Sequence, residues 1–239
     1  MTLPRLGMLT PSSNTALEPI TAAMLAGVAT LHVARFRVTE ITLSQQGLAQ
    51  FDDAPMLHAA SLLADARVAA IGWNGTSGGW LGFDVDRRLC AGITASTGIP
   101  ATTSMLALND ILAARGVRRL GLVTPYTRDV QARIQANYAA LGVETVAECH
   151  LGISENFAFA DVPAQQIAAM TREVAKARPD AIAIICTNLH AAPLAEMLEA
   201  ETGILVLDTI ATVVWRALQL AGADPRSVNG WGRLFREGT

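Results

Sequence analysis

The stretch LGMLTPSSNT at residues 6–15 returns as LGLVTPYTRD at residues 120–129, 114 residues further along the chain. Two more pairs follow in the same order with nearly the same spacing: GTS at 75–77 with CTN at 186–188, and STGIP at 96–100 with ETGIL at 201–205. Ordered matches of this kind indicate an internal duplication, although α/β proteins also reuse similar strand–turn–helix phrases.

Apolar strands and amphipathic helices alternate along the whole chain. The continuous apolar runs predict buried strands at residues 5–11, 31–38, 68–74 and 118–125, and helical periodicity predicts helices at 14–26, 53–66, 84–97 and 105–116. Apolar strands separated by helices are typical of parallel sheets. The sequence therefore predicts an α/β fold of two similar parallel-sheet halves, related by approximate two-fold symmetry, with a cleft between them.

No low-complexity linker separates the two halves. We expect residues 1–117 to form the first half and residues 118–239 the second, with the crossover near residues 100–118. The C-terminal tail, residues 210–239, is expected to pack back on the first half.

Composition excludes several classes of function. The chain has 239 residues, is 51% hydrophobic and carries a net charge of −3 with scattered Lys and Arg, which argues against nucleic acid as a partner. No apolar run reaches the roughly 18 residues of a membrane span. The N-terminus does not show, in order, the charged segment, long apolar stretch and small-residue cleavage site of a signal peptide. We expect a protein that contacts no membrane; its oligomeric state stays open.

Three cysteines, an odd number without framework spacing, favour a reduced, cytoplasmic protein. No Cys, His, Asp or Glu cluster has metal-ligand spacing, and there is neither a GxGxxG motif nor a Walker loop. We therefore expect no metal.

Four predicted strands end in polar residues, and the carboxyl ends of parallel strands are where ligands bind. The segments are Pro11-Ser12-Ser13-Asn14, Gly75-Thr76-Ser77, Pro125-Tyr126-Thr127 and Cys186-Thr187-Asn188. Hydroxyls, amides and free N–H groups before helices can bind a carboxylate without Lys or Arg. Each residue taken alone could be an ordinary helix cap or turn residue; together they predict an anion site in the cleft.

Cys186 ends the apolar run AIAII and precedes a helix expected near residues 192–193. A thiol there is partly shielded and close to N–H dipoles, so we expect it to exchange a proton near neutral pH; the alternative is a small buried hydrophobe. Cys90 and Cys149 are interpreted as structural, and His190 as a surface or cap residue rather than a thiol partner. Asp208 and Glu18 are interpreted as a strand-end and a helix-surface carboxylate.

Six motifs in order, GMLTPSSNT, GTS, GVRRLGLVTPYTRDV, LGIS, CTNL and GWGRLF, carry a resemblance that covers essentially the whole chain. The sequence resembles the aspartate/glutamate racemase superfamily, in the branch of arylmalonate decarboxylase and maleate cis-trans isomerase. The resemblance implies two α/β halves with pseudo-two-fold symmetry. Racemases of the superfamily place a cysteine on each face of the substrate; here the first position is Gly75 and the second is Cys186.

A site with one thiol cannot readily perform two-base racemisation, but it can decarboxylate a 2-substituted malonate and protonate the enediolate on one face. The resemblance implies Cys186 as proton donor, with Thr76, Ser77 and Tyr126 on the retained carboxylate and no cofactor. We expect the loop residues Gly75, Ser13, Asn14, Thr187 and Asn188 to complete the carboxylate site. The alternatives are an isomerase or racemase of a small dicarboxylate, and a non-catalytic carboxylate binder.

Two departures concern the substrate. The PSSNT loop with Asn14 is similar to the maleate isomerase version, not to the decarboxylase version. The apolar pocket is expected at Leu43, Leu48 and Phe159, with Glu40 and Asn156 making it more polar. The substrate is therefore expected to be an alkyl- or alkenylmalonate or a more polar diacid. Trp73 and Trp80 flank the Gly75 loop and either close over an apolar group of the substrate or pack in the core.

Because Gly75→Cys would place a thiol on the second face of the substrate, this substitution is expected to add racemising activity.

Overall fold

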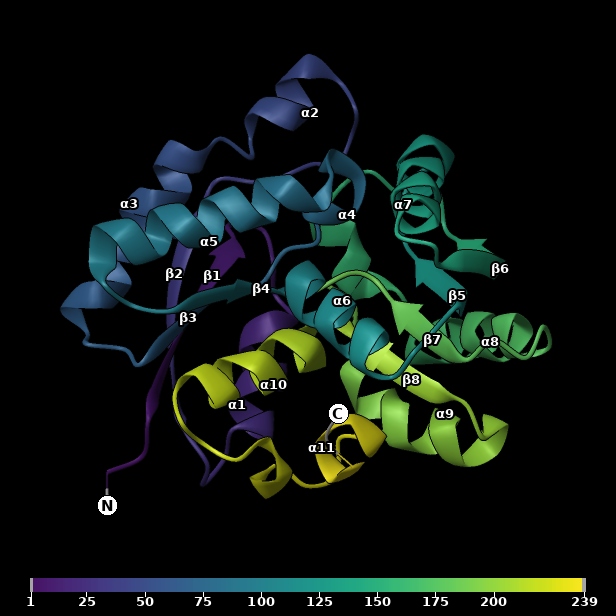
Figure 1. Cartoon of the computed structure of the whole chain (residues 1–239). Helices are drawn as coiled ribbons and strands as arrows, with labels where there is room; N and C mark the ends of the chain where they lie inside the picture. Colours follow the sequence, from purple (N-terminus) through teal and green to yellow (C-terminus); the bar gives the residue numbers. More distant parts are fainter. Residues whose placement is uncertain (1, 238–239) are drawn as a thin grey trace.

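Two four-stranded parallel sheets form the framework of the chain in a computed structural model that describes residues 2–237 (Figure 1). The first sheet has the order β2-β1-β3-β4 and the second β6-β5-β7-β8. The strands are β1 (Arg5–Pro11), β2 (Thr30–Phe36), β3 (Ala70–Trp73), β4 (Ala101–Thr103), β5 (Arg119–Thr124), β6 (Glu144–His150), β7 (Ala181–Ile184) and β8 (Leu205–Asp208). The identical strand order confirms the prediction of two similar parallel α/β halves.

Helices connect the strands in both halves. They are α1 (Leu17–Met24), α2 (Gln45–Ala49), α3 (Asp53–Asp65), α4 (Gly78–Leu81), α5 (Phe83–Thr97), α6 (Ser104–Ala114), α7 (Arg128–Ala140), α8 (Ala164–Ala175), α9 (Ala195–Thr202), α10 (Thr209–Leu220) and α11 (Arg233–Glu237). Short 3₁₀ turns occur at Phe157–Asp161, Ala192–Leu194 and Pro225–Ser227. None of the helices between residues 2 and 237 is both long and apolar enough to cross a lipid bilayer.

The predicted helices at 53–66, 84–97 and 105–116 agree with α3, α5 and α6 to within two residues. The first helix begins later than the expected residue 14, because the Asn14 side chain bonds the backbone that precedes it. Its Oδ1 accepts hydrogen bonds from the backbone amides of Ala16 and Leu17, which holds residues 14–16 in a turn before the helix.

The central strands β1 and β5 explain why their sequences repeat. Each is flanked by two parallel neighbours and buried on both faces, so it reads as a continuous apolar run. Each also contains a glycine where a neighbouring side chain approaches the strand closely. A Cβ atom at Gly7 would lie 2.9 Å from Val68, and one at Gly121 would overlap Val174 of α8.

The strand order places a topological switch point between β1 and β3 in one half and between β5 and β7 in the other. Ligand crevices in open α/β sheets lie at such points, beyond the carboxyl ends of the strands. The polar loops follow β1, β3, β5 and β7. These are the strands that flank the two switch points, so the loops lie where a ligand crevice is expected.

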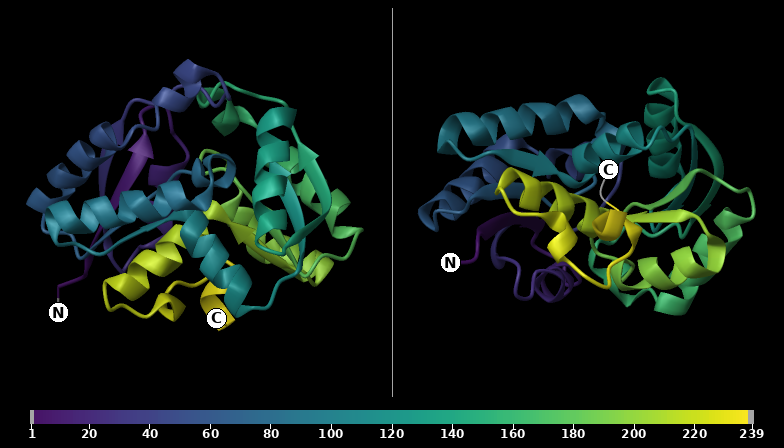
Figure 2. Two further views of the ribbon diagram at one scale, coloured as in Figure 1. Left: turned by 45° about the horizontal axis from the view of Figure 1, so that its top comes forward. Right: turned by 60° about the horizontal axis from the view of Figure 1, so that its bottom comes forward.

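Helix α10 follows the last strand of the second half but packs on β3, β4 and α6 of the first half (Figure 2). The Thr212 hydroxyl on α10 donates to the Ser104 carbonyl, 3.1 Å away. A second link joins α7 to α4, where Asn137 Nδ2 donates to the Gly79 carbonyl at 2.8 Å. Since the halves share one core, the division of the chain at residue 117 stays a prediction.

Gly121→Ala is expected to lower the free energy of unfolding by about 1–3 kcal/mol, because the added methyl group would overlap Val174. Urea unfolding followed by circular dichroism measures the change. Gly92→Ala in α5 is the matched control: its new Cβ would meet only the flexible end of Leu57 at 3.3 Å, and replacing a helical glycine stabilises by about 0.5–1 kcal/mol. Equal destabilisation of both variants would contradict the close-packing explanation.

Candidate active site

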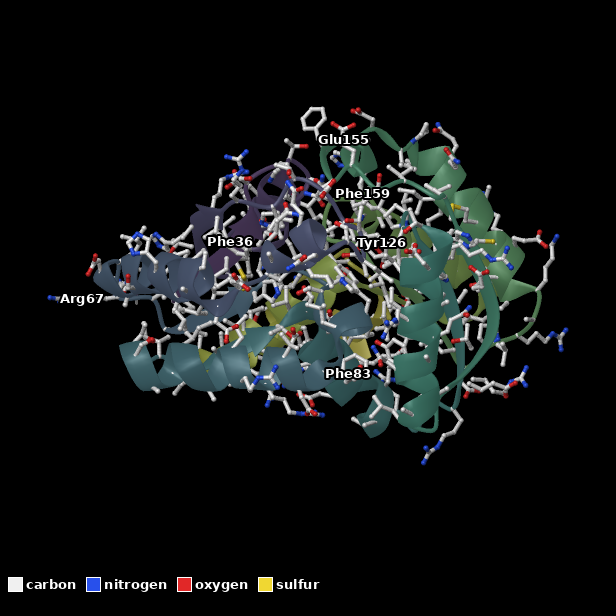
Figure 3. All side chains as sticks on the ribbon, turned by 90° about the horizontal axis from the view of Figure 1, so that it is seen from above. Phe36, Arg67, Phe83, Tyr126, Glu155 and Phe159 are labelled. Carbon is white, nitrogen blue, oxygen red and sulfur yellow. The ribbon has the colours of Figure 1, made fainter. Side chains whose placement is uncertain are left out.

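A narrow pocket lies between the two halves at the carboxyl ends of β1, β3, β5 and β7. Its free volume is about 10 Å³, which is room for about one water molecule. It is lined by Pro11, Ile41, Phe51, Trp73, Gly75, Thr76, Trp80, Tyr126, Asn156, Cys186 and Thr187. Figure 3 shows Tyr126 where the halves meet, with Phe159 beside it.

A chain of hydroxyl and thiol groups crosses this pocket. The Tyr126 hydroxyl lies 2.6 Å from Thr76 Oγ1 of the first half, and it is near enough to the Cys186 thiol for each group to influence the pKa of the other. The Cys186 sulfur accepts a hydrogen bond from the Asn188 amide, 3.4 Å away. Thr76, Tyr126 and Cys186, which the sequence assigns to one site, thus line one pocket.

Burial decides the protonation state of the thiol. The Cys186 side chain is buried, and loss of solvation raises the pKa of its thiol to about 12, although the Asn188 amide and Tyr126 act in the opposite direction. Desolvation therefore outweighs the N–H dipoles and keeps the thiol protonated. Burial likewise raises the pKa of Tyr126 well above its ordinary value. At neutral pH both groups are neutral, and the expectation that Cys186 exchanges a proton with a substrate stays a prediction.

The position that pairs with Cys186 in the first half is filled by an aromatic ring. A Cβ atom on Gly75 would overlap the six-membered ring of Trp73, which lies directly over this glycine. Trp73 is fully buried, and Phe36 packs against it with the ring centres 4.9 Å apart. Residue 75 therefore has no room for a side chain while Trp73 keeps this orientation.

Side-chain amides tie the strand-end loops of the two halves together. Asn14 Nδ2 donates to the Thr187 carbonyl at 2.9 Å, and the Thr187 hydroxyl donates to the Asn74 carbonyl at 3.0 Å. Asn188 Oδ1 accepts from the Thr15 and Ala16 amides at the start of α1. These groups hold the cleft closed, and binding a substrate carboxylate would require them to exchange these bonds.

The remaining predicted site residues lie near the pocket but outside its wall, as residues 2–237 define it. These are Ser13, Asn14, Ser77, Asn188, Leu43, Leu48 and Phe159. Leu43 precedes α2 and Leu48 lies within it, and both are half-buried. Phe159 packs edge-on against Tyr126, with ring centres 5.5 Å apart. Ser13 Oγ accepts a hydrogen bond from Asn156 Nδ2 at 2.7 Å. Their roles toward a substrate stay predictions.

The apolar wall combines Trp73 and Trp80, which the sequence analysis singles out, with Ile41 and Phe51, which it does not. Ile41 and Phe51 belong to the loop around α2, which an antiparallel bridge between Glu40 and Glu155 joins to the second half. Trp80 packs edge-on against Tyr126, with ring centres 5.2 Å apart. The loop register depends on this long-range bridge, so no local sequence signal could have shown which apolar residues face the pocket.

Asp208 is a buried carboxyl close to the thiol. Its Oδ1 accepts from the Ile210 and Ala211 amides, capping α10, whereas its Oδ2 is buried and makes no hydrogen bond to any group in residues 2–237. Desolvation raises its pKa to about 7, and its charge in turn raises the pKa of Cys186. In sequence, an Asp at a strand end before a helix is an ordinary cap, and no local signal shows that this one is buried near a thiol.

Within the described residues, no three His, Cys, Asp or Glu side chains lie close enough to hold a metal ion. His190 is exposed beyond the pocket wall.

The profile of the arylmalonate decarboxylase family matches residues 6–235. This chain belongs to that family. It is 30% identical to arylmalonate decarboxylase of Bordetella bronchiseptica over 65% of this chain and 66% of the relative, and 29% identical to maleate isomerase of Nocardia farcinica over 99% and 97%. The predicted branch of the racemase superfamily is thereby confirmed.

The solved structures that resemble this chain are likewise those of arylmalonate decarboxylases and maleate isomerases. One is a cysteine-to-serine mutant of Nocardia farcinica maleate cis-trans isomerase with a covalently bound succinylcysteine intermediate; it has a TM-score of 0.89 and 26% identity, covering 99% of this chain and 100% of that one. Another is an arylmalonate decarboxylase double mutant in its liganded form, with a TM-score of 0.87 and 25% identity, covering 98% and 100%. The chain is therefore related to enzymes of both kinds.

Stability is expected to fall as the pH rises from about 4 to about 7. In this range an unfolded aspartate has released its proton, but buried Asp208 retains it, so each step upward favours the unfolded chain. A shift of about three pKa units corresponds to a free energy on the order of 4 kcal/mol as an upper bound. Asp208→Asn should reduce this pH dependence, measured by urea unfolding at pH 5 and pH 8; an unchanged difference would contradict the assignment.

Proposed function

We propose that this member of the family is a decarboxylase of 2-substituted malonates that protonates its enediolate intermediate on one face. The observation that carries the proposal is the position of the Trp73 ring over Gly75. A two-thiol isomerase or racemase needs an acid or base on each face of the substrate. Here the second face is an indole, which cannot donate or accept a proton at a useful rate, so Cys186 is the acid.

The pocket offers different surroundings to the two carboxylates of a malonate. Thr76 and Tyr126 present hydroxyls that can bond the retained carboxylate. As CO₂ leaves, the electron pair of the broken C–C bond moves onto this group, and the enediolate gains a second negative charge there. Donors that are already oriented stabilise such charge without reorganisation.

The departing carboxylate would face the apolar wall, where water cannot solvate it. Ile41, Phe51 and Trp73 provide this wall. Desolvation raises the energy of a carboxylate more than that of neutral CO₂, so loss of the charge is favoured. The thiol of Cys186 then transfers its proton to the carbon of the enediolate. Each group that these steps require is a side chain of this protein.

The narrow pocket favours substrates with compact substituents. Trp73, Trp80 and Phe51 already fill part of its wall, so alkyl- or alkenylmalonates fit it better than larger aryl compounds. Asn156, buried and bonded to Ser13, adds one amide to the wall. This amide can bond a polar substituent on a diacid.

The proposal is tested by measuring CO₂ release in D₂O from methylmalonates with phenyl, alkyl or alkenyl substituents, with maleate as the control. We expect CO₂ release with deuterium on one enantiomer, and a rate about 10²–10⁴-fold lower for Cys186→Ala, since the general acid is lost. Cys149→Ala is the matched control and should keep the rate. Conversion of maleate to fumarate without CO₂ release would instead establish the isomerase alternative.

The Trp73 ring leads to a revised expectation for residue 75. Gly75→Cys alone should lose about 1–3 kcal/mol of stability through overlap with the indole, without gaining racemising activity. Gly75→Cys combined with Trp73→Leu should exchange the α-proton of the product on both faces. Chiral chromatography and α-deuterium exchange measure this, with Trp73→Leu alone as control. Equal racemisation by Gly75→Cys alone would show that the indole does not block the second face.

A further inference from the structure

Asp208 ends β8, and Cys186 follows the end of the neighbouring strand β7 by two residues. In the β7–β8 register Ile184 pairs with Asp208, so the Cys186 loop emerges next to this carboxyl. The Cys186 amide donates to the Thr209 hydroxyl at 3.1 Å, which fixes the loop to the residue after Asp208. Asp208 is fully buried, and its unpartnered Oδ2 leaves one carboxyl oxygen free.

The equivalent position in the first half has no such carboxyl. The strand registers make Thr103 of β4 the counterpart of Asp208, and Thr103 caps α6 as Asp208 caps α10. The Thr103 hydroxyl is fully used, because it accepts from the Leu106 amide and donates to Asp86. The half that carries the thiol is thus the half that has a free acid oxygen beside it.

One-face protonation leaves a chemical requirement that Cys186 cannot meet alone. Each turnover breaks the S–H bond, forms a C–H bond in the product and leaves a thiolate. A thiolate in a closed, nearly dry pocket is strongly destabilised, and the next substrate needs the thiol. A proton must therefore reach the sulfur from a group within the protein or from water.

We propose that Asp208 is the positioning residue that returns this proton: its buried carboxyl reprotonates the Cys186 thiolate after every turnover. The inference rests on the proposed decarboxylase function. The O–H bond at Oδ2 breaks and the S–H bond forms again, leaving an aspartate that takes a proton from water when the site opens to release its product. Oδ2 makes no hydrogen bond in the closed structure, so the transfer proceeds through one entering water or after rotation of the Cys186 side chain.

The surroundings of Asp208 favour this role. The charge of Asp208 raises the pKa of the Cys186 thiol, and Cys186 in turn raises that of the Tyr126 phenol. Within residues 2–237 no Lys, Arg or His forms a salt bridge with Asp208. Burial raises the pKa of Asp208 to about 7, so the carboxyl can hold a proton near neutral pH. Burial also raises the pKa of the Cys186 thiol, which favours transfer of that proton to a thiolate.

The test compares the first turnover with later ones. Asp208→Asn keeps the side-chain oxygen that caps α10 but holds no transferable proton. In a rapid-quench CO₂ assay we expect the variant to complete its first turnover at the wild-type rate, releasing one product per active site, and then to slow at least ten-fold. The wild-type steady-state rate should fall as the pH rises through about 7, where Asp208 ionises; the variant should lack this fall.

Asp86→Asn is the matched control, because Asp86 is also buried with a pKa raised to about 7 by desolvation but is coupled to Cys90 and Tyr138 instead of Cys186. It should show no burst and keep the pH profile. If Asp208→Asn does not fold, Asp208→Ser, which retains a capping oxygen, replaces it.

A variant without a burst and with the wild-type pH profile would overturn the relay, as would a first turnover slowed as much as the later ones. Failure of the proposed function looks different, because wild-type enzyme would then release no CO₂ from any malonate.

Discussion

Two asparagine side chains, one from each half, bond the same turn of backbone. Asn14 and Asn188 both direct their Oδ1 atoms at the Ala16 amide before α1, and Asn14 also donates to the Thr187 carbonyl. These bonds join loops that are 173 residues apart in sequence. They hold the carboxyl ends of the two sheets against each other, so the space between them is narrow and shielded from water. The chemistry of the pocket depends on that closure.

Exclusion of water acts on all three acids near the reaction in the same direction. It raises the pKa values of Cys186, Tyr126 and Asp208, and no cation in the described part of the chain forms a salt bridge to offset it. Of these, the Tyr126 hydroxyl and the Cys186 thiol line the pocket, and as neutral groups they can face a dianion without adding charge of their own. The same exclusion of water destabilises the charge of the carboxylate that leaves as CO₂. Desolvation therefore contributes to substrate binding, to bond cleavage and to protonation.

The fold and the centre of the site could be predicted from sequence because both rest on local signals. The alternation of apolar strands and helices, the glycines of β1 and β5, and the polar loops at the strand ends mark the repeat in the sequence. The symmetry of that repeat predicts that Thr76, Tyr126 and Cys186 lie together. The rest depends on partners far along the chain. Phe36 packs on Trp73 and orients its ring, the bridge of Glu40 to Glu155 sets which loop residues face the pocket, and burial beside Cys186 turns the Asp208 cap into an acid.

The ring over Gly75 also constrains how enzymes of this architecture could interconvert in evolution. A cysteine that arose at residue 75 in this background would collide with Trp73 before it could act. A smaller residue at 73, or another orientation of the Trp73 ring, is therefore needed before a side chain fits at residue 75. While the ring keeps its orientation, a second thiol at residue 75 therefore requires two changes rather than one. Trp73 in this way limits how readily a one-thiol enzyme can evolve into a two-thiol enzyme.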